Sequence, residues 1–139
     1  MGNQEQRSKD YLLITPQDVA TAGATATTTY VGVGPEYKAG KVIVSAHLTA
    51  TKTAVAALQE ATDSSGTSAT AVSGKTVTLT GEAGGSDEIG VIEFKASDLS
   101  TGYPYVGVTV TTNENGDDIC ATLLLVEPRK GQATMPETS

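Results

Sequence analysis

The sequence predicts an all-β protein that folds as a single antiparallel β-sandwich. Apolar and polar residues alternate at period two in several short segments between residues 41 and 126. Stretches rich in Gly and Ser separate these segments at the spacing expected for a sandwich or barrel. No helix-length periodic segment joins two of them, which argues against parallel strands connected by helices. We therefore expect one domain of jelly-roll or immunoglobulin-like type.

The clearest predicted strand lies in residues 41–50. One face carries Val42, Val44, Ala46, Leu48 and Ala50, and the other carries Lys41, Ser45, His47 and Thr49. This alternation is typical of a strand with one buried side.

Three further segments are candidate strands. Residues 55–61 form one of them, although their Ala and Leu content also permits a short helix. Residues 75–80 alternate Thr outward with Val77 and Leu79 inward. Residues 91–96 place Ile92, Phe94 and Ala96 on one face, and Val91, Glu93 and Lys95 on the other.

Residues 109–126 are predicted to form an antiparallel hairpin. Alternation before the acidic tip involves Val106, Val108 and Val110, and alternation after it involves Ile119, Ala121, Leu123 and Leu125. Asn115 and Gly116 tolerate the positive φ angles that a tight hairpin turn demands, so we place the turn there.

The acidic tip itself raises the alternative of a metal loop. A calcium loop of the EF-hand type with Gly116 at its sixth position would take its first and twelfth ligands from Thr111 and Thr122, which carry no carboxylate. We therefore expect a turn without a tightly bound metal, in which Asp117 and Asp118 are solvated. Weak cation binding at the tip stays open as an alternative.

Composition narrows the class of function. A chain of 139 residues suits one domain, and its net charge of -7 is opposite to what phosphate binding requires, so we expect no nucleic acid partner. Cys120 is the only cysteine, which excludes an internal disulfide and a thiolate zinc site. The first thirty residues hold no apolar stretch longer than Tyr11 to Ile14. We therefore expect no signal peptide, no membrane partner, and synthesis in the cytoplasm.

Motifs that suggest an active site are incomplete in this sequence. Residues 74–76 (GKT) match the end of a phosphate-binding P-loop, but Ala69 stands where that pattern needs its leading glycine. His47 is the only histidine, so a Ser-His-Asp centre would have to be built on it. Glu88 and Glu93 lie too far apart on one strand to suggest a glycosidase pair. We expect no enzyme, no catalytic residue, no metal ligand and no cofactor.

Residues 1–29 differ from the rest and are predicted to form an extended N-terminal arm. The sandwich is then expected at residues 30–129 and a C-terminal tail at 130–139. The arm contains one apolar run, formed by Tyr11, Leu12, Leu13 and Ile14, which water would not favour leaving exposed. We predict that these four residues contact a partner. In the alternative, they add an edge strand to their own sandwich.

Four stretches, "LQEATDSSGT", "SGKTVTL", "IGVIEFKASDLSTGYPYVGVTVTT" and "ATLLLVEPR", together resemble a family of small structural proteins of tailed bacteriophages. The genes of this family lie beside that of the major capsid protein, and the resemblance covers roughly residues 42 to 129. It implies a β-sandwich or jelly-roll virion component that decorates the outside of the icosahedral head. It carries no catalytic signature.

The resemblance also implies partners. The major capsid protein is the expected binding partner, and a homotrimer is expected because many head decoration sites lie on threefold positions. The alternative function is a carbohydrate- or receptor-binding module of a head fibre or tail component. Such a module would be expected to display clustered exposed aromatic residues, and Tyr103 and Tyr105 are the only close pair.

Overall fold

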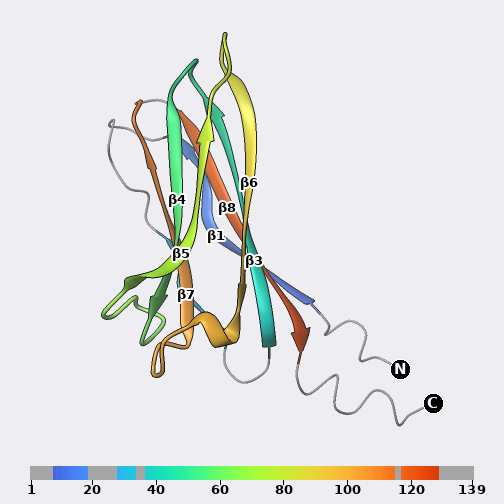
Figure 1. Ribbon diagram of the computed structural model, residues 1–139, viewed down its shortest axis with the longest axis vertical. Coiled ribbons are helices and arrows are strands. Elements are labelled where there is room, and N and C mark those ends of the chain that lie inside the picture. Colours follow the sequence, from blue (N-terminus) through green and yellow to red (C-terminus); the bar gives the residue numbers. More distant parts are fainter. Residues whose placement is uncertain (1–7, 19–27, 34–36, 115–116, 129–139) are drawn as a thin grey trace, which may run out of the picture.

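The computed structural model describes residues 8–18, 28–33, 37–114 and 117–128. Its strands form two four-stranded sheets, here called sheet A and sheet B, which pack face to face as a sandwich (Figure 1). Every described strand pair is antiparallel. The predicted antiparallel β-sandwich is therefore confirmed.

Sheet A has the strand order β1-β8-β3-β6. Its members are β1 (Ser8–Asp18), β8 (Asp118–Pro128), β3 (Tyr37–Leu48) and β6 (Ser86–Lys95). Sheet B has the order β2-β7-β4-β5, formed by β2 (Val31–Gly32), β7 (Tyr105–Thr112), β4 (Thr53–Ala61) and β5 (Thr70–Thr80). A short 3₁₀ helix, η3 (Ala96–Asp98), follows β6.

The order of the strands is that of a jelly roll. Among the described pairs, only β4 and β5 are neighbours both along the chain and within a sheet. All the other pairs join strands that are distant in sequence, as the Greek-key connections of a double-sheet jelly roll require.

The core lies between the two sheets and is filled by alternate residues of each strand. Along β3, Val42, Val44 and Leu48 are buried, whereas Ile43 and His47 face outward. The inward residues predicted for β7 and β8 are buried as well: Val106, Val108, Val110, Ile119, Ala121, Leu123 and Leu125. The period-two predictions are therefore confirmed for these strands.

Residues 55–61 lie in a strand and not in a helix. Their strand, β4, pairs with β5 on one side and with β7 on the other, so it is central in sheet B. These pairings and the burial of Ala56 and Leu58 override the helix propensity of Ala and Leu, which is only a weak local preference.

The predicted hairpin of residues 109–126 is wrong. β7 pairs with β2 and β4 in sheet B, whereas β8 pairs with β1 and β3 in sheet A, so the chain crosses between the sheets. Alternation looks the same in both arrangements, because it determines which residues point inward and not which strand is the neighbour. The predicted turn residues Asn115 and Gly116 lie outside the described residues.

Asp117 is buried, which corrects the prediction that it is solvated. Only 3% of its surface is exposed, and its Oδ1 accepts hydrogen bonds from the backbone N–H (3.2 Å) and the Oγ1 hydroxyl (2.8 Å) of Thr49. Its Oδ2 is buried without a hydrogen-bond partner in the described part of the chain. The two bonds tie the start of β8 to the loop that follows β3. Asp118 is exposed, as predicted.

The apolar run predicted to lie on an arm is instead part of the sandwich. Residues 8–18 form β1, an edge strand of sheet A that pairs with β8. A register shift after Leu12 accompanies the burial of two consecutive residues, Leu13 and Ile14, while Tyr11 packs against the core from a half-buried position.

The edge-strand alternative is thus the arrangement observed. The predicted partner contact is wrong for Leu13 and Ile14, because their own domain already buries them. Residues 8–18 belong to the sandwich and not to a separate arm. Contact of Tyr11 and Leu12 with a partner stays a prediction, as does the boundary at residue 130. Residues 1–7 and 19–27 of the predicted arm, and the whole of the predicted tail at 130–139, lie outside the described residues.

Candidate functional site

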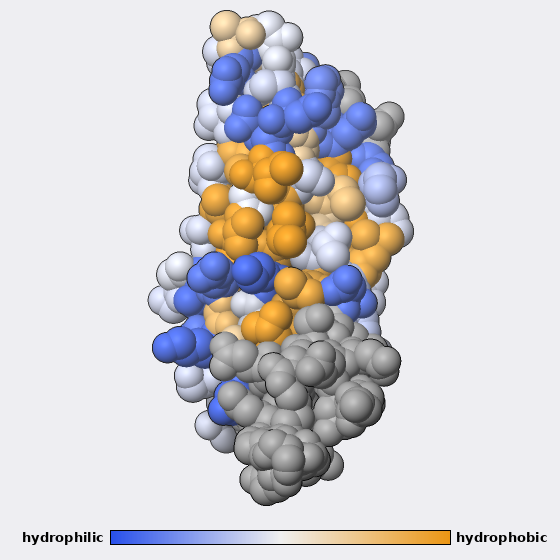
Figure 2. Space-filling model, turned by 90° about the vertical axis from the view of Figure 1, so that its right-hand side faces the viewer, coloured by the Kyte–Doolittle hydropathy of each residue, from blue (hydrophilic) through white to orange (hydrophobic). Residues whose placement is uncertain are grey.

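The outer face of sheet A is the most distinctive surface of the described molecule. Five large hydrophobic side chains are exposed among the described residues, and four of them lie on this face: Leu12 (50% exposed), Ile43, Ile89 (69%) and Val91 (46%). Figure 2 shows that hydrophobic surface gathers in the middle of this side of the molecule, with hydrophilic surface above and below. We call it the apolar face.

Strand register brings these residues together from four segments of the chain. Thr122 of β8 lies between Leu12 of β1 and Ile43 of β3, and Ile43 in turn lies beside Val91 of β6. Side chains directly opposite each other on one face of a sheet are in contact range, so these residues form a continuous row across the sheet. The next row contains Cys120, Ser45 and Ile89.

One end of the apolar face carries acidic groups and the only histidine. His47 of β3 lies between Asp118 of β8 and Asp87 of β6, and its Nδ1 is 2.6 Å from the Asp87 carboxylate. The hydrogen bond to Asp87 and its negative charge raise the pKa of His47, and Asp118 and Asp117 act in the same direction more weakly.

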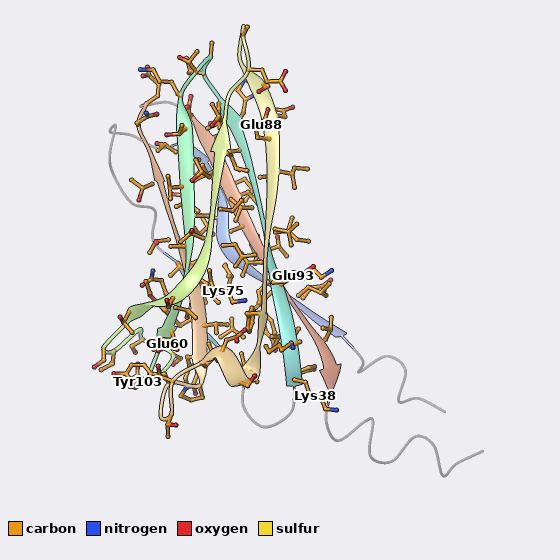
Figure 3. The ribbon with its side chains drawn as sticks, in the orientation of Figure 1. Lys38, Glu60, Lys75, Glu88, Glu93 and Tyr103 are labelled. Carbon is orange, nitrogen blue, oxygen red and sulfur yellow. The ribbon has the colours of Figure 1, made fainter. Side chains whose placement is uncertain are left out.

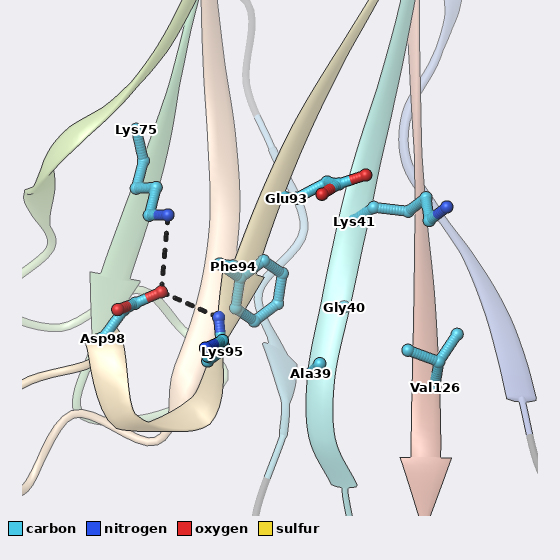
Figure 4. Close-up of a pocket in the computed structure, with 9 residues that line it drawn as sticks. All are labelled: Ala39, Gly40, Lys41, Lys75, Glu93, Phe94, Lys95, Asp98 and Val126. Atoms are coloured by element: carbon cyan, nitrogen blue, oxygen red, sulfur yellow. Dashed lines mark hydrogen bonds and ion pairs between the residues drawn. The ribbon is translucent and has the colours of Figure 1, made fainter.

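The opposite end carries lysines beside an open pocket of about 550 Å³ (Figure 4). Lys41 lies opposite Glu93 on the outer face, and Lys95 lies one row further along. Asp98 closes the pocket on the side of β5, because Lys75 Nζ is 3.4 Å from its carboxylate and the Lys95 backbone N–H donates to it at 2.8 Å. These interactions lower the pKa of Asp98, with the backbone hydrogen bond contributing most.

Glycine is needed beneath this pocket. Gly40 lies opposite Phe94, and a Cβ on Gly40 would be 2.8 Å from the Phe94 ring, closer than real Cβ contacts. The ring therefore occupies the space that a larger residue would take, and it stays buried while the lysines around it reach solvent.

Cys120 and His47, the side chains that could support nucleophilic chemistry, are not joined in the described structure. Cys120 lies diagonally across from His47, but no hydrogen bond joins them in the described part of the chain, and the Nδ1 of His47 is engaged by Asp87. Within the described ranges, no group of three or more His, Cys, Asp or Glu side chains is arranged to hold a metal ion. Equally, no described helix is long and apolar enough to cross a membrane.

Other residues considered from the sequence are also separated by the fold. Glu88 lies near the upper end of β6 and Glu93 lies lower on the same strand (Figure 3), and each lines a different pocket. Tyr103 and Tyr105 are both half-buried, and the Tyr105 ring lies 3.2 Å from the position of a Cβ on Gly32. This pair does not form the exposed platform that stacking on a sugar requires.

Sequence reasoning missed Ile43, Ile89 and Val91 as functional candidates, although a signal for Ile43 and Val91 exists. Each strand of sheet A contains adjacent apolar residues, in "YLLI", "VIV", "VI" and "LLLV", which breaks strict alternation. Apolar residues at consecutive positions are typical of a strand that is covered on both sides. This pattern marks sheet A as a sheet whose outer side is suited to burial.

Comparisons with known proteins reveal the fold and no family. No protein-family model matches the chain, and no curated protein sequence matches it. A chain in the structure of infectious bursal disease virus Gx strain has a TM-score of 0.51 at 13% identity, covering 86% of this chain and 32% of that one. The present chain thus spans about a third of the length of that viral chain.

Two further structures are less similar. A chain of the T13 IBDV viral particle gives a TM-score of 0.49 at 8% identity, covering 87% of this chain and 31% of that chain. A subunit of the disulfide-linked pili of Bacillus endospore appendages gives 0.46 at 10% identity, covering 86% of this chain and 87% of that chain. At these identities the likeness concerns the fold alone, a β-sandwich.

Proposed function

We propose that the protein is a non-enzymatic structural protein of a virion, which decorates and stabilises the outside of a tailed-phage capsid by binding the major capsid protein lattice. The apolar face carries this proposal. Soluble monomers rarely expose contiguous apolar surface across a whole sheet, and such surface usually marks a site of protein association. Assembly into a particle would bury this apolar surface between neighbouring chains.

Three further observations support the proposal. The jelly-roll order of the strands is used by viral capsid domains, and the similar chain of infectious bursal disease virus Gx strain comes from a virus particle. The resemblance to small tailed-phage structural proteins points the same way. The net charge of -7 suits the outside of a head, since packaged DNA would repel it from the inside.

The free energy gained by burying the apolar face is adequate for a protein that binds a lattice in many copies. Fully burying one Val, Leu or Ile side chain contributes about 1.5–3 kcal/mol, so covering four that are roughly half exposed contributes on the order of 4 kcal/mol per copy before ordering costs. A contribution of this size is modest for one copy. Many copies on a lattice add such contributions, which stabilises the shell against internal pressure.

Cosedimentation with phage heads tests this function. Heads assembled without the protein should bind it up to a fixed number of copies per head, and an antibody against it should label intact virions from outside. Heads that carry it should withstand heating better than heads without it. Absence of the chain from purified virions by mass spectrometry, or no saturable binding to heads, would refute the proposal.

A further inference from the structure

We infer that the apolar face is a twofold interface that binds a second copy of this chain. This inference rests on the proposed role in assembly and goes beyond it, because it assigns the apolar face to contact between two copies and leaves contact with the capsid protein to the other surfaces of the dimer. The exposed row from Leu12 through Ile43 to Val91 forms the centre of the interface. The charged ends of the same face decide how two copies align.

The centre of the face is suited to packing against its own copy. Ile43, Val91 and Ile89 are β-branched side chains on neighbouring strands, and they project from a four-stranded sheet with strands of about ten residues. Two sheets of similar twist pack face to face about 10 Å apart through interdigitated outward side chains. A second copy supplies a surface of matching twist and extent.

The charges select one of two orientations. A twofold axis parallel to the strands would place the acidic row of Asp87, His47 and Asp118 near the same row of the second copy, and like charges would repel. An axis across the strands reverses their direction instead. The acidic end of each copy then lies over the end of the other copy in which Lys41 and Lys95 balance Asp10 and Glu93, so the repulsion between two acidic rows is removed.

Strand register gives the expected partners across this axis. Counted in steps of two residues along β6, Asp87 lies two rows from Val91 on one side, and Lys95 lies two rows away on the other. With the axis at the row of Ile43 and Val91, exposed Lys95 of one copy faces exposed Asp87 of the other, and the pair occurs twice. Isologous symmetry thus joins opposite charges around an apolar centre.

Sedimentation velocity of the full-length chain provides the first test, with a matched pair of variants. Val91 and Val55 are exposed to similar degrees, 46% and 41%, but Val55 lies on the outer face of sheet B. We expect wild type to sediment as a dimer and Val55→Lys to remain one. Val91→Lys should raise the dissociation constant by about 100-fold, because it would bury an unpaired charge at the centre.

A charge swap tests the orientation. Lys95→Glu alone and Asp87→Lys alone should each weaken the dimer by about tenfold, since each places like charges opposite each other. The double variant Lys95→Glu and Asp87→Lys restores opposite charges across the interface and should return the dissociation constant to within about threefold of wild type. Circular dichroism should show the same β spectrum for all these variants.

Several outcomes would overturn the inference. They are a wild-type chain that stays monomeric at all accessible concentrations, equal effects of Val91→Lys and Val55→Lys, or no recovery in the double charge variant. A trimer, as the tailed-phage resemblance implies, would also contradict it. Head binding is a separate measurement: a dimer that fails to bind heads would refute the proposed function and leave this inference intact.

Discussion

The two outer faces of the sandwich differ in chemistry although their backbones are alike. Sheet A presents aliphatic side chains in the middle of its outer face, between charged ends. Sheet B presents mainly hydroxyl groups on β5, β4 and β7, from Thr76, Thr78, Thr80, Thr53, Thr109 and Thr111. Threonine and valine have nearly the same shape and both favour strands, so the choice between them has little effect on strand formation. It decides whether the face prefers water or another protein surface.

The first prediction compares a core residue and a surface residue of one strand, β1, and has the largest expected effect. Leu13→Ala should lower the free energy of unfolding by about 3 kcal/mol, because Leu13 is buried in the core. Leu12→Ala, half exposed on the apolar face, should change it by less than about 0.5 kcal/mol. Urea unfolding at concentrations where the chain is monomeric measures both. Similar values would mean that β1 is not anchored in the core.

The second prediction concerns the crossing from sheet B to sheet A, where Asp117 is buried. Asp117→Ala should cost about 2 kcal/mol, because the Thr49 N–H and hydroxyl lose their acceptor. Asp117→Asn keeps an oxygen acceptor and should cost much less, and Asp118→Ala should stay within about 0.5 kcal/mol. Thermal unfolding with and without a chelator gives these values. A chelator effect on wild type would instead support a bound cation.

Exchanging valine and threonine between the two outer faces tests directly whether the side chains of sheet A cause self-association. Val91→Thr makes the apolar face resemble sheet B, and Thr78→Val enlarges the apolar surface beside Val55. Each should change the free energy of unfolding of the monomer by less than about 0.5 kcal/mol. Only Val91→Thr should weaken self-association in sedimentation velocity. Weakening by both variants, or by neither, would remove the distinction between the two faces.

The smallest expected effect is the titration of His47 at the acidic end of the apolar face. Its pKa, measured by NMR, should lie above 6.5, and Asp87→Asn should move it back toward that value. A raised pKa in the folded chain means that His47 stabilises the fold fully below pH 6.5 and that this contribution disappears as pH rises through the folded pKa. A folded pKa at or below 6.5 would contradict the His47–Asp87 contact.

Burial of individual residues could be predicted from the sequence, but neighbours could not. Alternation correctly assigned the inward residues of β3, β7 and β8, because period two is a local property of an extended chain. Alternation wrongly suggested that β7 pairs with β8, because a hairpin and a crossing between sheets require the same alternation. The same limit explains Asp117, whose partner Thr49 is 68 residues away.

The apolar face was likewise only partly predictable from the sequence. The sequence marks Leu12 as part of an apolar run, whereas Ile43 and Val91 look like ordinary strand residues and Ile89 lies outside the predicted strands. The adjacent apolar neighbours of Ile43 and Val91 could have marked these two, but nothing local indicates that the three residues share one face. That follows from the order of β1, β8, β3 and β6, which brings together segments from the whole length of the chain.

The amino-acid sequence alone is enough to predict most of the strands, the inward side of most of them, the acidic net charge and the single cysteine. Each depends on composition or on contacts between residues close along the chain. Only the tertiary structure decided which strands share a sheet, that β1 belongs to the core, and that four separate aliphatic segments form one apolar face. The physical reason is that strand pairing and core packing lower the free energy of the chain through contacts between distant residues, which local patterns do not encode.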